Sequence, residues 1–458
     1  MLKVNAAVKK LKQLLKDRCL TDKLSLVQYG YDATQNIYLP DVVALPEDSG
    51  EVSQIMKIAS KYKIPVVARG WGSGFTGGAL NVKGGICLSL EKMDRIIEFD
   101  KDNMMIWVEA GIVNYDLQEY LKPYGLFFPP DPSSWKFSTI GGNIAENAGG
   151  PRAVKYGTTK NWVKGLEIVL YDGSIIKTGS KNIKDVAGYD LTSLIVGSEG
   201  TLAIITKALL KLFPIPPAKK TMQLIFDKMK EAAAMVNKIL LEGILPTSIE
   251  FVDRFAIETV RDATGVNLPD ADAILILEVD GTEAEVEFAT KSIETLSQKN
   301  SSVIGFKIAQ NPKEEEEIWF ARRTISPTLK RIADGKLNED IVVPVAYLAD
   351  MIEILQQISK KYALPIINFG HAGDGNIHVN IMYHKDSKDE TKRAFKAMDE
   401  VFKETLRLGG SITGEHGVGI TKASYIEAQL GKTQLELLRK IKQAFDPLNI
   451  INPGKMGL

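Results

Sequence analysis

Glycine makes up half of one short stretch of the chain, residues 69–78, which contains five glycines. The stretch follows a predicted strand at residues 65–68 and precedes a strand-like run at residues 85–90. Backbone so rich in glycine favours neither helix nor strand, but its N–H groups can turn toward an anion. In the dinucleotide fingerprint a helix follows the glycines, whereas here a strand follows. The pattern predicts an anion-binding loop, with a plain flexible turn as the alternative, and disfavours a nicotinamide-binding Rossmann domain.

Two further segments consist mainly of small and hydrogen-bonding residues, residues 131–150 and residues 197–206. Small side chains let the backbone pass close to a flat polar ligand. A predicted hairpin that turns on Asp172-Gly173 lies between the two segments. Three separated segments of this kind indicate one large cofactor that is held at several points.

Histidine is rare, and two of the four histidines flank Asp374-Gly375, in the sequence from His371 to His378. Asp-Gly between β-prone runs predicts a two-residue type I′ hairpin turn. That register places His371 directly opposite His378, with Cβ atoms about 4.5–5.5 Å apart, and puts Asn380 on the same face. Two converging imidazoles can bind one metal ion, and a packed, hydrogen-bonded pair is the alternative.

A third histidine, His416, stands beside Glu415 in the glycine-rich residues 414–419, while His384 lies in a polar turn typical of the surface. Packing alone favours apolar residues in such loops, yet three of the four histidines occupy them. This distribution favours a metal site or a proton-transfer site over simple packing.

Composition excludes several classes of protein. The 57 basic side chains balance 57 acidic ones, so no net charge attracts nucleic acid or an anionic membrane. Cys19 and Cys87 are too few for a disulfide framework or an iron–sulfur cluster. No stretch reaches about 18 consecutive apolar residues, the length that a membrane-spanning helix needs. We therefore expect a cytoplasmic protein that does not bind nucleic acid.

The 458 residues are enough for two or three domains. A proline-rich linker is predicted at residues 213–217, because proline interrupts both helix and sheet. After it, strands alternate with helices, which predicts an antiparallel sheet covered by helices on one face. One of these helices carries Arg322-Arg323; such a pair is usually surface, but an arginine fork is also the best clamp for a carboxylate.

Taken together, six segments resemble the FAD-dependent D-2-hydroxyacid dehydrogenases of the vanillyl-alcohol-oxidase superfamily, which include D-lactate dehydrogenases, D-2-hydroxyglutarate dehydrogenase and the large subunit of glycolate oxidase. The segments are residues 69–78, 131–150, 197–206, 371–378, 414–419 and 452–455. The resemblance implies an α+β fold, with a two-part FAD-binding domain of the vanillyl-alcohol-oxidase (PCMH) type and a cap domain of antiparallel sheet covered by helices. It places the FAD-binding domain at residues 1–213, the cap or substrate domain at residues 214–410, and a segment that completes the active site and the FAD-binding part at residues 411–458.

The resemblance also implies a reaction: FAD- and metal-dependent oxidation of a small D-2-hydroxyacid to the 2-oxoacid. Electrons would pass to a partner protein, such as an electron-transferring flavoprotein or an iron–sulfur subunit, or to a quinone. The enzyme would be cytoplasmic, with any membrane association made through a partner, and a homodimer is compatible with the family. The divalent metal would be Zn, Mn or Fe.

By the same resemblance the site residues divide into three groups. The catalytic residues are His416 as base, Arg322 as carboxylate clamp and Asn380; the metal ligands are His371, His378 and Glu415. The FAD-binding residues are Arg69, Gly70, Trp71, Gly72, Ser73, Gly74, Phe75, Thr76, Gly77, Pro132, Ser133, Thr139, Gly141, Gly142, Asn143, Gly149, Gly157, Gly200, Ile204 and Asn452. Ser73 stands where flavinylated members carry a linking histidine, so non-covalent FAD is expected. Arg323 remains an alternative to Arg322.

Two other functions remain open on the residues alone. A metallohydrolase could use two histidines and one glutamate, but it leaves the three glycine-rich segments unexplained. A non-redox member of the superfamily, of the alkyl-dihydroxyacetone-phosphate synthase type, would not need the His371–His378 pair beside Glu415.

Overall fold

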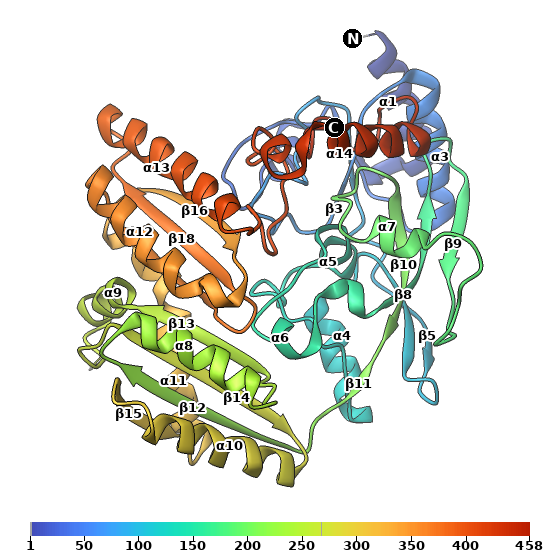
Figure 1. Cartoon of the computed structure of the whole chain (residues 1–458). Coiled ribbons are helices and arrows are strands. Elements are labelled where there is room, and N and C mark those ends of the chain that lie inside the picture. Colours follow the sequence, from blue (N-terminus) through green and yellow to red (C-terminus); the bar gives the residue numbers. More distant parts are fainter. Residues whose placement is uncertain (1, 267) are drawn as a thin grey trace. The chain divides into compact units, whose positions relative to one another are not determined.

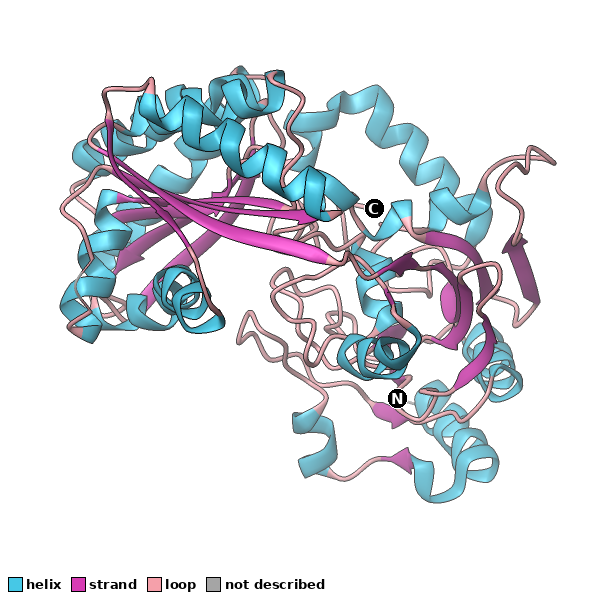
Figure 2. Ribbon diagram, turned by 90° about the horizontal axis from the view of Figure 1, so that it is seen from below, coloured by secondary structure: helices cyan, strands magenta, loops and turns pink. Residues whose placement is uncertain are grey.

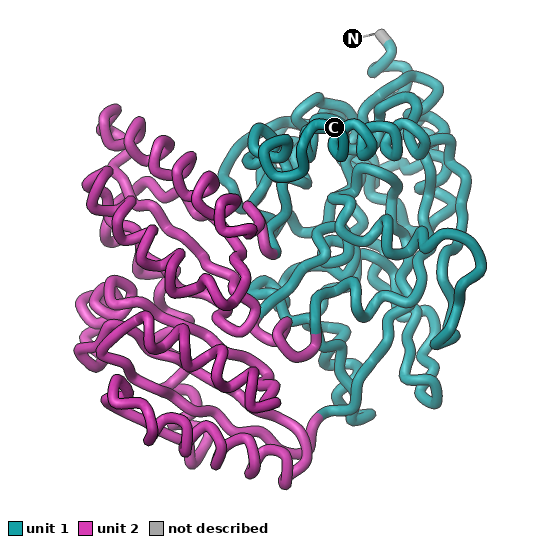
Figure 3. The backbone as a smooth tube through the Cα atoms, in the orientation of Figure 1, with its two compact units in different colours: residues 1–150, 157–215, 415–458 teal, residues 151–156, 216–414 magenta. Residues whose placement is uncertain are grey.

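The computed structural model describes residues 2–266 and 268–458, and these residues form two units (Figures 1 and 3). Unit 1 contains the residues up to Gly150, Gly157–Ile215 and Glu415–Leu458. Unit 2 contains Pro151–Tyr156 and Pro216–Gly414. The units therefore divide at positions 215/216 and 414/415, where the sequence suggested 213/214 and 410/411, and the short segment Pro151–Tyr156 belongs to unit 2.

The first sheet of unit 1 forms around a β-α-β unit. Parallel strands β2 (Val42–Ala44), β4 (Ile86–Ser89) and β3 (Val66–Arg69) follow one another across it, and β1 (Cys19–Leu20) adds to β2 in the antiparallel sense. The helix α3 (Ser49–Tyr62) connects β2 to β3, and it begins at the side-chain cap of Asp48. Near the C-terminus Ile451 pairs with Val66 in parallel, so the tail of the chain lies beside β3.

A second sheet of unit 1 is antiparallel, with the strand order β5-β6-β10-β8-β9. Its strands are β5 (Ile96–Asp100), β6 (Met105–Glu109), β10 (Ile204–Lys211), β8 (Val163–Val169) and β9 (Ile175–Gly179). The hairpin predicted on Asp172-Gly173 is confirmed as β8–β9. The proline-rich stretch begins in a short strand rather than a pure linker, because β11 (Phe213–Pro214) pairs with β7 (Leu126–Phe127).

Helices of different lengths complete unit 1. They are α1 (Leu2–Leu15), α2 (Lys23–Gln28), α4 (Asn114–Leu121), α5 (Ile140–Glu146), α7 (Leu191–Ile195), α14 (Ile426–Phe445) and the 3₁₀ turns η1 (Lys16–Arg18), η2 (Lys122–Tyr124) and η3 (Thr159–Asn161). Across all described residues, no helix is both long enough and apolar enough to cross a membrane.

Unit 2 is built on one seven-stranded sheet whose neighbouring strands are all antiparallel, as the sequence predicted. In spatial order the strands are β15 (Val303–Ile308), β12 (Ala218–Phe226), β14 (Ala273–Gly281), β13 (Ser248–Asp253), β17 (Ile366–His371), β18 (Asn376–Tyr383) and β16 (Gly335–Val342). The short α6 (Ala153–Tyr156) also belongs to this unit, together with η4 (Leu329–Arg331) and η5 (Val345–Tyr347).

Helices cover both faces of this sheet, and the expectation of a single covered face is wrong (Figure 2). The larger layer consists of α8 (Met229–Leu241), α10 (Glu283–Gln298), α12 (Leu348–Tyr362) and α13 (Lys388–Arg407). The second layer consists of α9 (Arg254–Thr264), which the sequence reading missed, and α11 (Pro312–Thr328). These two helices pack against Val252, Ile276 and Phe369, because that face of the sheet is too apolar to be left in water.

The β17–β18 hairpin is wider than predicted. His371 lies opposite Asn376, and His378 lies opposite Phe369, so four residues rather than two form the loop. The neighbouring strand explains the difference, because the N–H groups of Ala372 and Gly373 both donate to the carbonyl of Ile249. Phe369, the partner of His378, lies two residues before His371, and side chains two residues apart on a strand point to the same face. The two histidines are therefore diagonal neighbours on one face, and their ring centroids lie 5.1 Å apart.

We expect Gly375→Ala to destabilise unit 2 strongly. Gly375 has a φ of +78°, and an added Cβ would lie 2.0 Å from the carbonyl oxygen of Val343. Gly243→Ala is the matched control, because Gly243 has a φ of +76° and no described atom lies within 4 Å of its Cβ position. The control should lose about 1–2 kcal/mol from conformational strain alone. Urea unfolding should show a clearly larger loss for Gly375→Ala; equal losses would contradict the tight turn.

Candidate functional site

The first glycine-rich loop of unit 1 packs directly against the second small-residue segment. A Cβ on Gly70 would lie 2.4 Å from the Thr139 hydroxyl oxygen, so only glycine allows this approach. Thr139 in turn accepts the N–H of Gly142 at 3.1 Å and caps the start of α5. Gly72 and Gly77 have φ of +69° and +80°, a conformation that glycine adopts readily. The structure therefore brings two of the three predicted cofactor segments together.

Several buried polar atoms around these segments make no hydrogen bond to the described protein. They are Arg69 Nη1, Ser138 Oγ, Asn143 Nδ2 and Ser198 Oγ. A native protein pairs nearly all such atoms, so a cluster of them suits a polar ligand that supplies the missing partners. Together with the glycine contacts, this fits a dinucleotide such as FAD.

The C-terminal tail supports the same loops. The side-chain amide of Asn452 donates to the carbonyls of Gly78 and Glu199, at 3.0 and 2.8 Å. Lys455 donates to Asn452 Oδ1 at 3.1 Å and to the carbonyl of Leu80 at 2.6 Å. Asn452 thus connects residues 197–206 to residues 69–78 through hydrogen bonds from its side-chain amide to backbone carbonyls.

The loop of Glu415 and His416 is held inside unit 1 by Glu199. The Glu199 carboxylate accepts the N–H groups of Val418 and Gly419 at 2.7 and 2.6 Å. The His416 ring lies 5.0 Å from the ring of Phe75, centroid to centroid. His416 therefore adjoins the glycine-rich loop, and its Nε2 lies 3.9 Å from Glu415 Oε1.

A second carboxyl group, that of Glu146, lies next to Glu199, and its Oε2 is buried. A Cβ on Gly417 would lie 2.3 Å from Glu146 Oε2 and 3.0 Å from Glu199 Oε1, so the two acids approach the same point. Burial, with the charge of Glu199 in addition, raises the pKa of Glu146 well above its usual range. Burial also raises the pKa of Glu199, while its two backbone N–H bonds oppose this. The negative charge of Glu199 thus disfavours ionisation of the neighbouring Glu146.

The other predicted cofactor residues occupy different environments. Gly74 has open space around it, and Gly149 lies beside Glu415. The side chains of Trp71 and Phe75 are about half exposed, with 55% and 46% of their surface accessible. The remaining ones are Ser73 (half-buried), Thr76 (buried), Pro132 (buried), Ser133 (exposed), Gly141 (against Ala110), Gly157 and Gly200 (both with positive φ) and Ile204 (in the core of β10). Ile204 could reach a ligand only through its backbone.

On unit 2, sheet register gathers polar side chains on one face. Glu250, His371 and Asn376 lie directly opposite one another across β13, β17 and β18. His378 lies two residues after Asn376 on β18, and Asp340 of β16 lies directly opposite it. The possible ligand atoms of Asp340 and His378 lie within 4.8 Å of each other. Strands that are distant in sequence therefore build one polar cluster.

Glu250, which the sequence reading missed, links His371 to Arg322. Its Oε1 lies 2.5 Å from His371 Nδ1, and its Oε2 accepts the Arg322 Nε–H at 2.7 Å. Burial acts to raise the pKa of Glu250, but the neighbouring His371 and Arg322 outweigh it and lower the pKa below its usual value. A charged residue inside the apolar strand of residues 248–253 was the signal that could have revealed it.

The structure distinguishes the two adjacent arginines. Arg322 reaches onto the polar face and lies over the ring of Phe369, 4.6 Å from its centroid. Arg323 pairs with Glu316, and 52% of its side chain is exposed. Only Arg322 is joined to the histidine cluster.

Asp340 is the second residue that the sequence reading missed. It accepts the N–H of Gly414 through its side chain, at 3.0 Å, and through its backbone carbonyl, at 3.1 Å. It also accepts the Asn376 amide at 2.6 Å. Since Glu415 is the next residue after Gly414, Asp340 holds the chain immediately before the predicted third metal ligand.

Asn380 lies on the same face, as predicted. Its amide group donates to the carbonyls of Ile367 and His378, each at 3.2 Å. Its buried Oδ1 makes no hydrogen bond within the described part of unit 2, and the same is true of Asn376 Oδ1.

The donors on this face fit a divalent transition metal. Imidazole nitrogen and carboxylate oxygen suit Zn, Mn and Fe. Glu250 bonds one ring nitrogen of His371, as carboxylates do for metal-binding histidines, and this leaves Nε2 as the nitrogen that would bind the metal.

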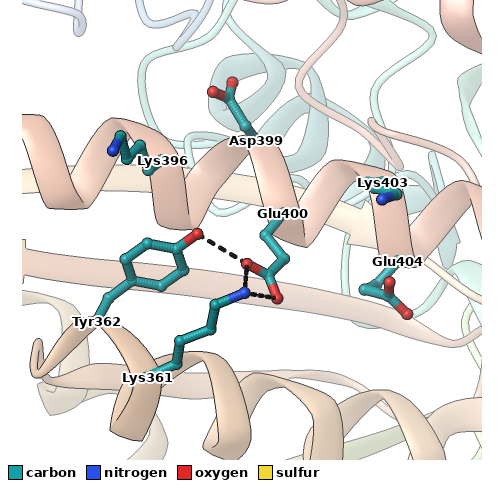
Figure 4. Close-up of a pocket in the computed structure, with 7 residues that line it drawn as sticks. All are labelled: Lys361, Tyr362, Lys396, Asp399, Glu400, Lys403 and Glu404. Carbon is teal, nitrogen blue, oxygen red and sulfur yellow. Dashed lines mark hydrogen bonds and ion pairs between the residues drawn. The ribbon is translucent and has the colours of Figure 1, made fainter.

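A separate surface hollow lies between α12 and α13 of unit 2 (Figure 4). Its lining is charged, and Tyr362 and Lys361 both donate to Glu400 there, at 2.8 and 2.7 Å. None of the predicted site residues lines this hollow. Its paired charges are those of a solvated surface.

Comparison with known proteins gives consistent matches along the chain. Residues 40–179 match the family described as "FAD binding domain", and residues 215–456 match "FAD linked oxidases, C-terminal domain". The chain is 43% identical to the glycolate oxidase subunit GlcD of Bacillus subtilis (strain 168), covering 93% of this chain and 91% of the relative. It is 37% identical to a D-lactate dehydrogenase of Archaeoglobus fulgidus, covering 93% of this chain and 95% of the relative.

Solved structures share the fold. The structure of p-cresol methylhydroxylase matches with a TM-score of 0.81 at 19% identity, covering 100% of this chain and 97% of that one. An alkyldihydroxyacetonephosphate synthase matches with a TM-score of 0.77 at 21% identity, covering 98% and 85%. These similarities confirm the predicted architecture of a vanillyl-alcohol-oxidase-type FAD-binding part with a second α+β part.

Gly70→Ala should give a folded protein with little bound flavin. The added methyl group would push Thr139 away and separate the two segments that meet at Gly70. Gly74→Ala is the control in the same loop, because no described atom lies within 4 Å of its Cβ position. The ratio of visible flavin absorbance to protein absorbance measures the outcome. Full flavin content in Gly70→Ala would contradict a cofactor role for this contact.

Proposed function

Because the chain belongs to the family of FAD-linked oxidases, we propose that it oxidises a small D-2-hydroxyacid to the corresponding 2-oxoacid with the help of a divalent metal. It is an FAD-dependent oxidoreductase of the glycolate oxidase and D-lactate dehydrogenase type. The observation that carries the metal and substrate proposal is the Glu250-bound His371 next to His378 on one sheet face.

When bound, FAD supplies a two-electron acceptor, and the metal supplies Lewis acidity toward a hydroxyl and a carboxylate. The residues of unit 1 hold FAD without a covalent bond in this proposal, since serine occupies position 73. The buried unpaired atoms of Ser138 and Asn143 are suitable partners for its polar groups.

His371, His378 and Glu415 are the proposed metal ligands. Two observations support the set: His371 Nδ1 is engaged by Glu250, and Gly414, the residue before Glu415, is bonded to Asp340 beside His378. Each histidine would offer a neutral nitrogen, and Glu415 a negative oxygen.

The substrate carboxylate is assigned to Arg322. Its Nε is used by Glu250, so the two terminal nitrogens are the ones that would form a planar fork on a carboxylate. His416 is assigned as the base that takes the hydroxyl proton, and Asn380 Oδ1 as a polar contact on the same face as the histidine pair.

The electron acceptor is proposed to be a separate protein or a quinone. Cys19 and Cys87 are both buried and free, so these cysteines offer no second redox centre. The relatives include a D-lactate dehydrogenase of Arabidopsis thaliana whose name specifies cytochrome, 35% identical over 98% of this chain and 79% of the relative. Direct assay of the reduced protein with each candidate acceptor tests this proposal.

The main alternative is non-redox chemistry of the alkyl-dihydroxyacetone-phosphate synthase type. The structural match to such a synthase supports a common fold alone, at 21% identity. A metallohydrolase does not account for the FAD-binding domain. Bleaching of the flavin by D-lactate, glycolate, D-2-hydroxyglutarate or D-2-hydroxybutyrate in the absence of oxygen would test the redox proposal, and failure of all four would favour the synthase type.

His371→Ala and His378→Ala should each lose the metal and most of the activity while keeping FAD. His416→Ala should keep the metal, but flavin reduction by substrate should slow by about 10²–10⁴-fold, the usual contribution of a general base. His384→Ala is the control, because 63% of its side chain is exposed. Metal analysis and rapid-mixing absorbance measure these effects, and unchanged metal content in both hairpin variants would remove the metal site.

Arg322→Lys should raise the KM for substrate about 10- to 100-fold, the equivalent of a lost charge-assisted hydrogen bond of about 1.5–3 kcal/mol. Lysine keeps the charge but has no planar fork. Arg323→Lys is the adjacent control and should be silent, since Arg323 is exposed. Steady-state kinetics decide the assignment: the opposite pattern would transfer the clamp to Arg323.

A further inference from the structure

Glu250 occupies a position where packing does not require a carboxylate. Its lateral neighbour on β14 is Ile276, and Val252 follows on the same face of its own strand. The side chain is fully buried. Burying a charge is unfavourable unless partners compensate for the lost water, so the fold alone would favour an apolar residue at this point.

Both oxygens of Glu250 bond groups that the proposed function uses. Oε1 lies 2.5 Å from His371 Nδ1, and Oε2 lies 2.7 Å from Arg322 Nε. An ionised carboxylate only accepts hydrogen bonds, so both partners must donate. The proton of the His371 ring is therefore held on Nδ1, and the guanidinium plane of Arg322 is fixed at its Nε edge.

We propose that Glu250 is a positioning residue that couples the metal site to the carboxylate clamp. It sets the His371 tautomer that leaves Nε2 for the metal, and it also sets the direction of the Arg322 terminal nitrogens. One rigid group in the middle of β13 thereby fixes the spacing between the metal and the clamp, which a hydroxyacid must bridge through its two functional groups. This inference rests on the proposed function and adds a residue that the sequence reading did not assign.

Glu250→Gln tests the idea with almost no change of volume. Glutamine has one acceptor oxygen and one donor NH₂, so it can serve only one of its two partners. The charged Arg322 is the stronger donor and should take the oxygen. The NH₂ group then faces His371 Nδ1, and the ring must move its proton to Nε2, where it blocks metal binding.

The measurement is the affinity of the metal-free, FAD-loaded full chain for Zn²⁺ and for Mn²⁺, by competition with a chelator. We expect Glu250→Gln to weaken metal binding about 10- to 100-fold, the usual effect of removing a partner of a ligating histidine, and also to raise the KM for substrate. FAD content should be unchanged. Glu278→Gln is the matched control, a buried carboxylate on the next strand and the same face, whose partners are Thr221 and Lys219 rather than the cluster.

A double variant separates positioning from general damage to the fold. In Glu250→Gln/Arg322→Met the competing donor is gone, so the glutamine oxygen can accept from His371 again. Metal affinity should recover toward the wild-type value, while the KM should stay high because the clamp is absent. Damage to packing alone would not be relieved by a second substitution.

The outcomes separate this inference from the function on which it rests. Loss of metal in His371→Ala but normal metal affinity in Glu250→Gln would overturn the role of Glu250 and leave the metal site standing. Normal metal affinity in both would overturn the metal site and this role together. Weak binding in Glu250→Gln without recovery in the double variant would overturn the tautomer mechanism. The proposal is supported if Glu250→Gln binds the metal weakly, the double variant recovers metal affinity, and Glu278→Gln binds the metal normally.

Discussion

The hydrogen-bond register between β13, β17, β18 and β16 is the constraint on which the candidate site depends. It aligns Glu250 with His371 and Asp340 with His378, although these partners are up to 121 residues apart in sequence. A slip by one residue would send either side chain to the opposite face of the sheet. The apolar remainder of that face packs against α9 and α11, which makes such a slip costly. The chemistry of unit 2 is thus supported by the same contacts that form its core.

In unit 1 the candidate cofactor site depends instead on the close approach of backbone segments. Gly70 meets Thr139, Asn452 joins Gly78 to Glu199, and Glu199 carries the loop of His416. The contact at Gly70 needs a residue without a Cβ, whereas Asn452 and Glu199 connect the segments through side-chain hydrogen bonds to the backbone. Glu199 accepts two backbone N–H groups of the His416 loop, and burial, together with the charge of Glu199, raises the pKa of the neighbouring Glu146.

Much of the architecture could be read from local patterns. The α3 helix, the β8–β9 hairpin and the antiparallel sheet of unit 2 follow from apolar periodicity, capping residues and Asp-Gly turns, which act over a few residues. The helices α9 and α13 were missed, and the β17–β18 turn was taken as two residues instead of four. In the second case the hydrogen bonds that Ala372 and Gly373 donate to the carbonyl of Ile249, a residue more than a hundred positions away, outweigh the local turn preference.

The sequence by itself determined the residue types available for chemistry: three glycine-rich segments, three histidines in glycine-rich loops, and an arginine pair on one helix. It also identified the family, because many short motifs occur in a fixed order. Only the tertiary structure decided that Arg322 rather than Arg323 joins the histidines, and that Glu250 and Asp340 complete their surroundings. The physical reason is that exposure and partner choice arise from strand register and helix packing, which bring together positions whose spacing along the chain carries no signal.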